Sequence, residues 1–170
     1  AVRAEYGKQC RSLFTVPDGR VLVGADASGL ELRMLAHYMD DPTYTNEILT
    51  GDIHTANQHA AGLDNRDDAK TFIYAFLYGA GDAKIGSIVG GSAAHGKRLK
   101  ASFLKNTPAL ADLRTETMAD AETGFLSGLD GRRIRVRSAH AALNTLLQGA
   151  GAVVMKQAIV ILYDLLERVD

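Results

Sequence analysis

Two basic and two aromatic residues at successive i+4 spacings form the most informative pattern in the sequence. They are Arg66, Lys70, Tyr74 and Tyr78. In an α-helix, which turns about 100° per residue, residues four apart lie on one face. Such a face can hold a nucleoside triphosphate lengthwise, because cations bind phosphates and flat rings contact the sugar and the base. Taken alone, the same pattern also fits a surface helix with solvated basic residues and half-buried tyrosines.

The residues between these four positions indicate the helix that must carry them. The opposite face collects apolar side chains, namely Ala69, Phe72, Ile73, Phe76 and Leu77. This two-sided pattern predicts a helix over residues 67–78 that buries one face and presents the other to a site. The partial positive charge of the helix N-terminus adds to the two cations at the phosphate end.

A second candidate group is the carboxylate of Asp26. It ends a short β-branched run, residues 21–26, which predicts a buried strand whose tip delivers Asp26 to a site. An apolar stripe directly after it predicts a helix that ends at the Asp-Asp-Pro run of residues 40–42. Ser28 and Glu31 have the spacing of a capping box at the start of that helix.

Most of the remaining chain is predicted to be helical. Apolar periodicity between Gly, Pro and Asn residues predicts helices over residues 43–50, 53–62, 93–104 and 109–123. Together with the strand before Asp26, these elements predict an α+β fold that is predominantly helical.

A basic segment follows the predicted helices. The Asp-Gly pair at residues 130–131 is typical of a β-hairpin turn, and the strand after it alternates arginine with apolar residues. Its arginines are Arg132, Arg133, Arg135 and Arg137. Two interpretations fit: a sequence-independent contact with a phosphate backbone, or an edge strand that its charges protect from further pairing.

The last predicted helix begins near Ala141 and is apolar almost all round. Residues 138–155 contain no Asp, Glu, Lys or Arg, which makes a membrane span one alternative. Asn144 and Gln148, two amides at i, i+4, favour a buried helix instead. Gly149 and Gly151 lower the helix propensity there, which indicates close packing or the approach of a ligand.

Composition limits the class of protein further. The chain has 170 residues, 46% of them hydrophobic, which is enough for a buried core. Nineteen Lys and Arg against twenty Asp and Glu give a net charge of −1, so any nucleic-acid site must be local. One cysteine, Cys10, forms no internal disulfide, and the charged first fifteen residues do not resemble a signal peptide. We expect a protein of the reducing cytoplasm.

Four ordered motifs resemble those of the DNA polymerase I family, also called family A. Residues 26–33 have the form Asp-x-Ser-x-x-Glu-Leu-Arg, and residues 66–79 the form Arg-x3-Lys-x3-aromatic-x3-Tyr-Gly. Residues 51–55 resemble the Asp-Ile-His segment of the family, and residues 144–148 resemble its Asn-x3-Gln helix. The amino-acid sequences of these motifs most resemble those of the replicative polymerases of podovirus-type phages.

The resemblance implies fingers and part of the palm of a right-hand polymerase. Residues 1–40 would belong to the palm with the first catalytic motif, residues 41–139 to the fingers, and residues 140–170 to a palm helix. The implied function is template-directed addition of deoxynucleotides to a primer 3′-hydroxyl, with release of pyrophosphate. The His-Asp-Glu of the family's third motif does not occur in the sequence. We therefore expect a fragment of a longer enzyme that has no polymerase activity alone.

The resemblance also implies roles in phosphoryl transfer, which in this family uses two Mg²⁺ ions. Asp26 would ligate both ions, and the backbone carbonyl of Ala27 would ligate the ion that arrives with the nucleotide. Arg66 and His54 would bind the phosphates of the incoming dNTP. Lys70 would neutralise the charge that develops toward pyrophosphate, and it is the strongest candidate for a general acid.

Three further residues are implied to select the nucleotide. Glu31 would lie under the sugar as a steric gate against a ribonucleotide 2′-hydroxyl. Tyr74 occupies the position that governs tolerance of nucleotides lacking a 3′-hydroxyl, and a tyrosine there implies tolerance. Tyr78 would lie near the templating base and the hinge of the fingers.

The remaining implied site contacts primer–template DNA. Arg3, Asn144 and Gln148 match positions that contact the duplex near the primer terminus, and His140 stands where some relatives carry arginine. The expected partners are primer–template DNA, dNTP and an accessory processivity factor, with no membrane, in the cytoplasm of a phage-infected bacterial cell. Two alternatives remain open: a single-subunit RNA polymerase fragment, and a non-catalytic helical module that binds nucleic acid.

Overall fold

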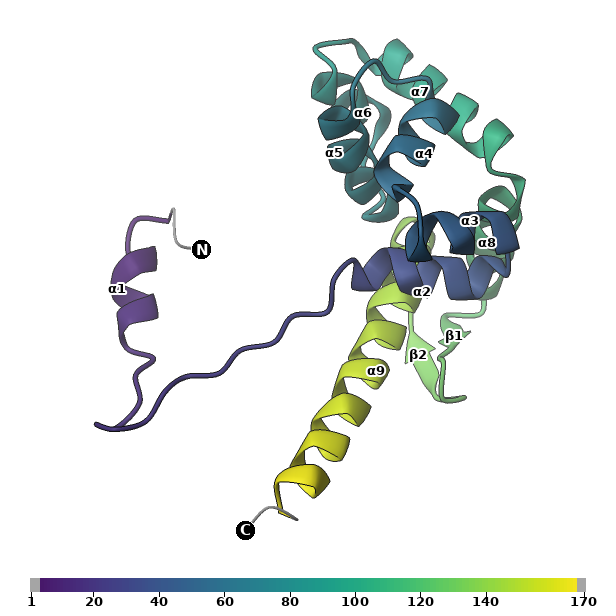
Figure 1. The fold of residues 1–170 in the computed structure, drawn as a ribbon. Helices are drawn as coiled ribbons and strands as arrows, with labels where there is room; N and C mark the ends of the chain where they lie inside the picture. Colours follow the sequence, from purple (N-terminus) through teal and green to yellow (C-terminus); the bar gives the residue numbers. More distant parts are fainter. Residues whose placement is uncertain (1–3, 168–170) are drawn as a thin grey trace.

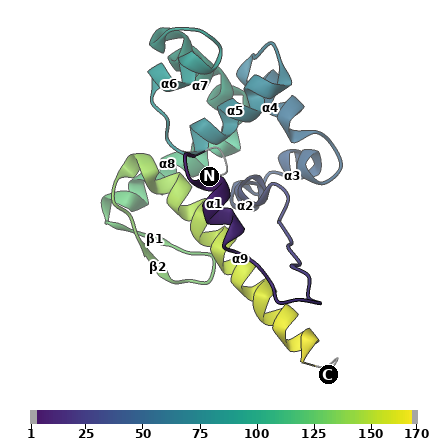
Figure 2. The ribbon, with the colours of Figure 1, turned by 90° about the vertical axis from the view of Figure 1, so that its left-hand side faces the viewer.

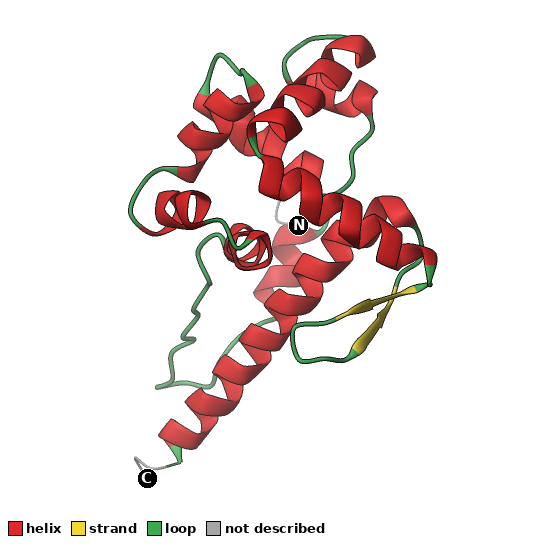
Figure 3. Cartoon of the chain, turned by 90° about the vertical axis from the view of Figure 1, so that its right-hand side faces the viewer, coloured by secondary structure: helices red, strands yellow, loops and turns green. Residues whose placement is uncertain are grey.

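The computed structural model describes residues 4–167, and helices make up most of this range (Figures 1 and 3). In chain order the elements are α1 (Gly7–Ser12), α2 (Leu30–Met39), α3 (Pro42–Leu49), α4 (Ile53–Ala61), α5 (Arg66–Leu77), α6 (Asp82–Ile88), α7 (Ala93–Asn106), α8 (Pro108–Glu122), β1 (Phe125–Ser127), β2 (Arg133–Arg135), the 3-10 helix η1 (Ala139–Ala141) and α9 (Ala142–Leu166). The predominantly helical α+β class is confirmed.

The helices predicted from periodicity are present, with ends that differ by one or two residues. Two short helices, α1 and α6, were not predicted. Both are under eight residues long, which is too short to establish an apolar period. Gly86 in α6 also reads as a helix breaker, although it is needed there because a Cβ would lie 2.0 Å from the Ser92 carbonyl oxygen.

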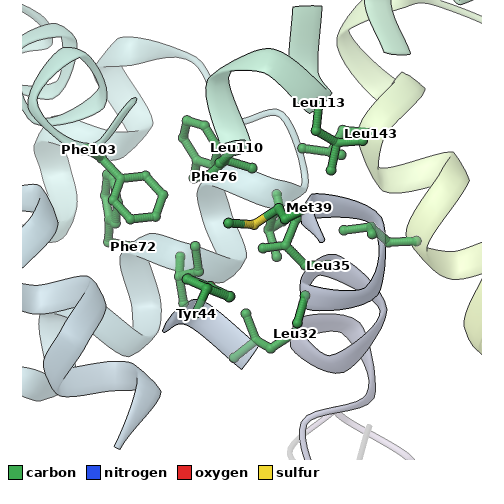
Figure 4. Close-up of a cluster of buried hydrophobic side chains, with 14 of the residues drawn as sticks. Leu32, Leu35, Met39, Tyr44, Phe72, Phe76, Phe103, Leu110, Leu113 and Leu143 are labelled. Atoms are coloured by element: carbon green, nitrogen blue, oxygen red, sulfur yellow. The ribbon is translucent and has the colours of Figure 1, made fainter. Parts of the chain in front are cut away.

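The helices form two groups that share one core. Helices α4, α5, α6 and α7 pack together, and α2 packs against α3, α8 and α9 (Figure 1). Figure 4 shows the side chains that join the groups: Phe72 and Phe103 lie at one end, and Leu35, Met39 and Leu143 at the other. The aromatic rings of Phe72, Phe76 and Phe103 are packed edge to face around Phe103, with centroids 5.2 and 5.3 Å from it.

The strand predicted over residues 21–26 is wrong. This segment is extended but unpaired. Figure 1 shows it as part of the long connection from α1 to α2, outside the packed helices. Val21, Leu22 and Val23 are more than 70% exposed. A strand needs a neighbour for its backbone N–H and C=O groups, and no segment among residues 4–167 pairs with it. Its β-branched composition therefore specified an extended backbone but not burial.

The buried helix predicted from about residue 141 is correct only in its first part. In α9 the buried residues end at Gly151, and the apolar side chains from Ile159 to Leu166 are mostly exposed. Close packing explains the two glycines, since a Cβ at Gly149 would lie 2.8 Å from Ile134 and one at Gly151 3.1 Å from Leu30. By length and composition the helical run 139–166 could cross a membrane, and 22% of its most apolar window is buried.

The predicted hairpin is present. Strands β1 and β2 pair antiparallel in the register Leu126 to Ile134, and Figure 2 shows them beside α9. The guanidinium of Arg133 lies 4.0 Å from the ring centroid of Phe125, and Arg132 pairs with Asp130 in the turn. Because Arg135 and Arg137 are exposed, part of the basic strand faces solvent.

Burial of the phenylalanine cluster predicts a large loss of stability on truncation. Phe103→Ala removes a fully buried ring that contacts α5, so the free energy of unfolding should fall by about 3–5 kcal/mol. Urea denaturation followed by circular dichroism measures this. Phe14→Ala, whose ring is 79% exposed, is the control and should change stability by less than about 0.5 kcal/mol. Equal losses in the two variants would contradict the packing described here.

Candidate active site

A cavity of about 380 Å³ lies among α2, α3, α4 and α5, and it collects most of the predicted nucleotide-binding residues. His54 lines it from α4, and Arg66, Lys70 and Tyr74 line it from α5. The i+4 face predicted for residues 66–78 is therefore real over its first three positions. Tyr78, at the end of α5, does not line this cavity.

Local hydrogen bonds fix where α5 begins. The side chain of Asn65 accepts a hydrogen bond from the backbone N–H of Asp68 at 2.8 Å, and its amide donates to the Asp68 carboxylate at 2.7 Å. This reciprocal cap makes Arg66 the first residue of the helix. Ala69, Phe72 and Ile73 are fully buried on the other face, so the rotation of α5 leaves Arg66 and Lys70 exposed toward the cavity.

Asp52 forms the best-defined polar contact in the cavity. Its carboxylate accepts two hydrogen bonds from Arg66, from Nε at 2.6 Å and from Nη2 at 3.1 Å. It also caps α4 by accepting from the His54 N–H at 3.1 Å and from the Thr55 hydroxyl at 2.9 Å. The hydrogen bonds from Arg66 hold the pKa of this carboxyl well below its usual range. Sequence reasoning did not single out Asp52, although it lies two residues before His54 in the same motif.

The surroundings of His54 favour the neutral form of its ring by lowering its pKa. Burial lowers its pKa below 6.5, and the charges of Arg66 and Lys70 lower it further, whereas Asp52 acts in the opposite direction. Its Nδ1 atom is buried and has no hydrogen-bond partner within the described part of the chain. Its ring centroid lies 6.3 Å from that of Tyr74. A neutral imidazole beside two cations can donate one N–H to an anion that enters the cavity.

The side-chain amide of Gln148 joins Glu31 and Tyr78. The Gln148 Nε2 donates to the Glu31 carboxylate and to the Tyr78 hydroxyl, both at 3.1 Å. These residues come from α2, the end of α5 and α9, which are far apart in the sequence. Burial raises the pKa of Tyr74, and the Glu31 charge contributes, which places the carboxylate near the tyrosine face of α5. Three residues implied to contact nucleotide or DNA are thus joined directly.

The capping box predicted for Ser28 and Glu31 is wrong. Gly29 is the N-cap residue of α2, with φ of 60°, and no side chain caps this helix. The left-handed conformation suits glycine and changes the direction of the chain, so the Ser28 hydroxyl does not cap the helix. Glu31 is therefore free to accept from Gln148 rather than from the backbone.

Asp26 and Ala27 lie immediately before the edge of the cavity. Ser28 and Gly29 line it, and the Arg33 Nε donates to the Ser28 carbonyl oxygen at 2.9 Å, which holds this loop against α2. Asp26 is exposed and Ala27 is half-buried. Asp26 itself does not line the cavity; it lies two residues before Ser28, which does.

The predicted DNA-binding residues are only partly brought together. Arg3 lies outside the described residues. Asn144 is half-buried one turn before Gln148 on α9. His140 lines a second cavity, of about 310 Å³, beside Gly79. A Cβ at Gly79, whose φ is 74°, would lie 2.7 Å from the His140 carbonyl oxygen, so only glycine allows the end of α5 to pass this close to η1.

Comparison with known protein families identifies the family of the chain. The sequence model of DNA polymerase family A matches residues 1–170. The chain therefore belongs to the family A DNA polymerases.

Phage DNA polymerases are among the proteins to which the chain is similar. The chain is 52% identical over 181 aligned residues to the DNA-directed DNA polymerase of Enterobacteria phage T3, and equally to that of Escherichia phage T7. Each alignment covers 91% of this chain and 26% of the relative. DNA polymerase I of Deinococcus radiodurans is 31% identical over 94% of the chain and 19% of the relative. The chain thus spans about a quarter of the length of its phage relatives.

A solved structure shares the fold. It is the POL domain of Pol1 from M. smegmatis, in complex with DNA primer-template and dNTP, and it matches with a TM-score of 0.79 at 22% identity. The match covers 99% of this chain and 34% of the other. At this identity the likeness shows the fold of a polymerase domain, consistent with the predicted helical class.

The environment of His54 predicts its titration. Followed by NMR, the His54 ring should titrate below pH 6.5, and Arg66→Ala should raise its midpoint because one of the repelling charges is removed. Since the folded chain binds this proton less readily than the unfolded chain, His54 contributes a loss of stability as pH falls below 6.5 toward the lowered midpoint. A His54 midpoint that stays constant in Arg66→Ala would show that the two side chains do not interact.

Proposed function

We propose that this chain forms the nucleotide-binding part of a template-directed DNA polymerase that adds deoxynucleotides to a primer 3′-hydroxyl. The observation that carries the proposal is the cavity in which His54, Arg66, Lys70 and Tyr74 line one space beside the loop that follows Asp26. Membership in family A and the DNA-directed polymerases of phages T3 and T7 support it. The substrates would be primer–template DNA and dNTP, in the cytoplasm of a phage-infected bacterial cell.

The donor atoms before the cavity suit magnesium. Within residues 4–167 no three His, Cys, Asp or Glu side chains gather as a metal site. Mg²⁺ is commonly held by one or two carboxylates together with substrate phosphates, and Asp26 with the Ala27 carbonyl offers hard oxygen donors of that kind. We propose that these two residues hold two Mg²⁺ ions with the nucleotide. When bound, the ions would activate the primer hydroxyl and stabilise charge on the leaving pyrophosphate.

The cationic end of the cavity would bind the triphosphate. Arg66 and His54 can each donate N–H groups to phosphate oxygens. Lys70 is exposed one helical turn further along α5, and no ion pair engages it in the described part of the chain. Its ammonium is therefore free to neutralise the pyrophosphate and to donate a proton to the leaving oxygen.

The other end of the same face would check the sugar and the base pair. We propose that Glu31 closes the space beside the sugar C2′, which excludes a ribonucleotide hydroxyl. Its hydrogen bond from Gln148, and that amide's bond to Tyr78, would couple this gate to the templating position. Gln148 can then exchange these partners for minor-groove acceptors, which all base pairs present.

Three sets of residues would contact the DNA itself. Asn144 lies one turn from Gln148 on α9, and His140 lies just before that helix. Arg135 and Arg137 are exposed on and after β2 and can contact the phosphate backbone without reading sequence. An accessory processivity factor is a further proposed partner.

The role of Lys70 can be tested in a chimera in which residues 1–170 replace the matching segment of the phage T7 polymerase. Lys70→Ala should lower kcat for primer extension by about 10²- to 10⁴-fold, because the general acid is lost. Lys105→Ala, which removes an exposed lysine at the end of α7, should leave kcat unchanged. Single-turnover primer extension measures both, and a full rate with Lys70→Ala would contradict the proposal.

The hydroxyl of Tyr74 should set the response to dideoxynucleotides. In the same chimera, Tyr74→Phe should lower incorporation of dideoxynucleotides relative to deoxynucleotides by about tenfold, the cost of about one hydrogen bond. Competition between ddNTP and dNTP on a primed template gives this ratio. An equal preference before and after the substitution would refute the assignment of Tyr74.

A further inference from the structure

We propose that Asp52 is a positioning residue of the nucleotide site, which acts by holding the guanidinium of Arg66 in place for the triphosphate. The inference rests on the proposed function, since it assigns a role within the same cavity. Asp52 would touch neither the nucleotide nor a reacting atom. Its effect would pass through Arg66 and through the start of α4, which carries His54.

The contacts of Asp52 tie two helix ends together. One carboxylate accepts from Arg66 on α5 at 2.6 and 3.1 Å, and from the His54 N–H and the Thr55 hydroxyl on α4 at 3.1 and 2.9 Å. The bidentate arrangement fixes the plane of the guanidinium as well as its position. The spacing between the two phosphate-binding residues, Arg66 and His54, is thereby set by a single side chain.

The arrangement leaves Arg66 able to bind an anion. A guanidinium has five N–H groups, and Asp52 accepts from two of them. The side chain of Arg66 is 49% exposed and lines the cavity. Three N–H groups in a fixed plane can therefore meet phosphate oxygens with little further ordering of the side chain, which lowers the entropic cost of binding.

Charge alone predicts the opposite effect, and this contrast makes the inference testable. A carboxylate that lines an anion-binding cavity repels a triphosphate, so its removal should tighten binding if Asp52 acts only as a charge. If Asp52 acts by positioning Arg66, its removal should weaken binding. The two roles thus predict shifts of opposite sign for the same substitution.

Stability does not explain the pair. Both side chains are close to half exposed, and exposed ion pairs contribute little to folding. Asparagine and serine are also good N-cap residues, so Asp52→Asn and Asp52→Ser retain the cap of α4 while they remove the charged, two-oxygen acceptor of Arg66. A thermal melt of each variant of the 170-residue chain checks that the fold is kept.

The experiment measures dNTP incorporation by the chimera defined above. Asp52→Asn and Asp52→Ser should each raise KM for dNTP about tenfold, with kcat changed less than about threefold. Neither should raise KM further in an Arg66→Ala background, because the residue through which Asp52 acts is already absent. Asp64→Asn is the matched control: it removes an exposed carboxylate two residues before Arg66 and should leave KM unchanged.

The outcomes separate the two proposals. An unchanged or lower KM in both Asp52 variants overturns the positioning role, and so does a rise that persists without Arg66. If these results occur while Lys70→Ala still lowers kcat for primer extension as predicted, the proposed function stands and only the role of Asp52 fails. If the unmodified chimera extends primers and neither Lys70→Ala nor Arg66→Ala affects it, the proposed function fails, and the role of Asp52 fails with it.

Discussion

The packing of α5 through its aromatic face is the constraint on which the rest of the site depends. Phe72 and Phe76 surround Phe103 of α7 with nearly perpendicular rings, and Ile73 is fully buried beside them. Because side chains on opposite faces of a helix are fixed relative to one another, burial of these rings determines which way Arg66 and Lys70 point. The hydrophobic core, rather than any polar contact, therefore directs the cationic face into the cavity.

Polar contacts then fix the positions of side chains on α5, whose orientation the hydrophobic core has determined. At one end of α5 the Asp52 carboxylate joins the starts of α4 and α5, and at the other end the Gln148 amide joins α2, α5 and α9. These bonds are too exposed to add much to the free energy of folding. They set distances and planes instead, which the proposed binding of phosphate and checking of the base pair would require. Hydrogen bonds of Asp52 and of Gln148 therefore fix the two ends of α5, the helix that carries the candidate site.

The chain also carries apolar surface that residues 4–167 do not cover. Val21 to Val23 are extended and exposed, and the last three turns of α9 expose isoleucine, leucine and tyrosine side chains. In the sequence, one segment leads into the loop at Asp26 and the other continues α9 beyond Gln148. Burial predicted from apolar composition is wrong for residues 21–26 and correct for α9 only as far as Gly151, because apolar composition specifies a preference for burial but supplies no partner.

The sequence by itself determined the helices and the face that carries the site, because i+4 periodicity and short-range caps are local properties of the chain. It also determined the family, through ordered motifs whose residue types reflect their chemistry. Only the tertiary structure decided that Asp52 engages Arg66, that Glu31 binds Gln148 instead of capping α2, and that residues 21–26 lie unpaired. These outcomes depend on which distant groups meet in space, and no local periodicity encodes a contact between residues 117 positions apart.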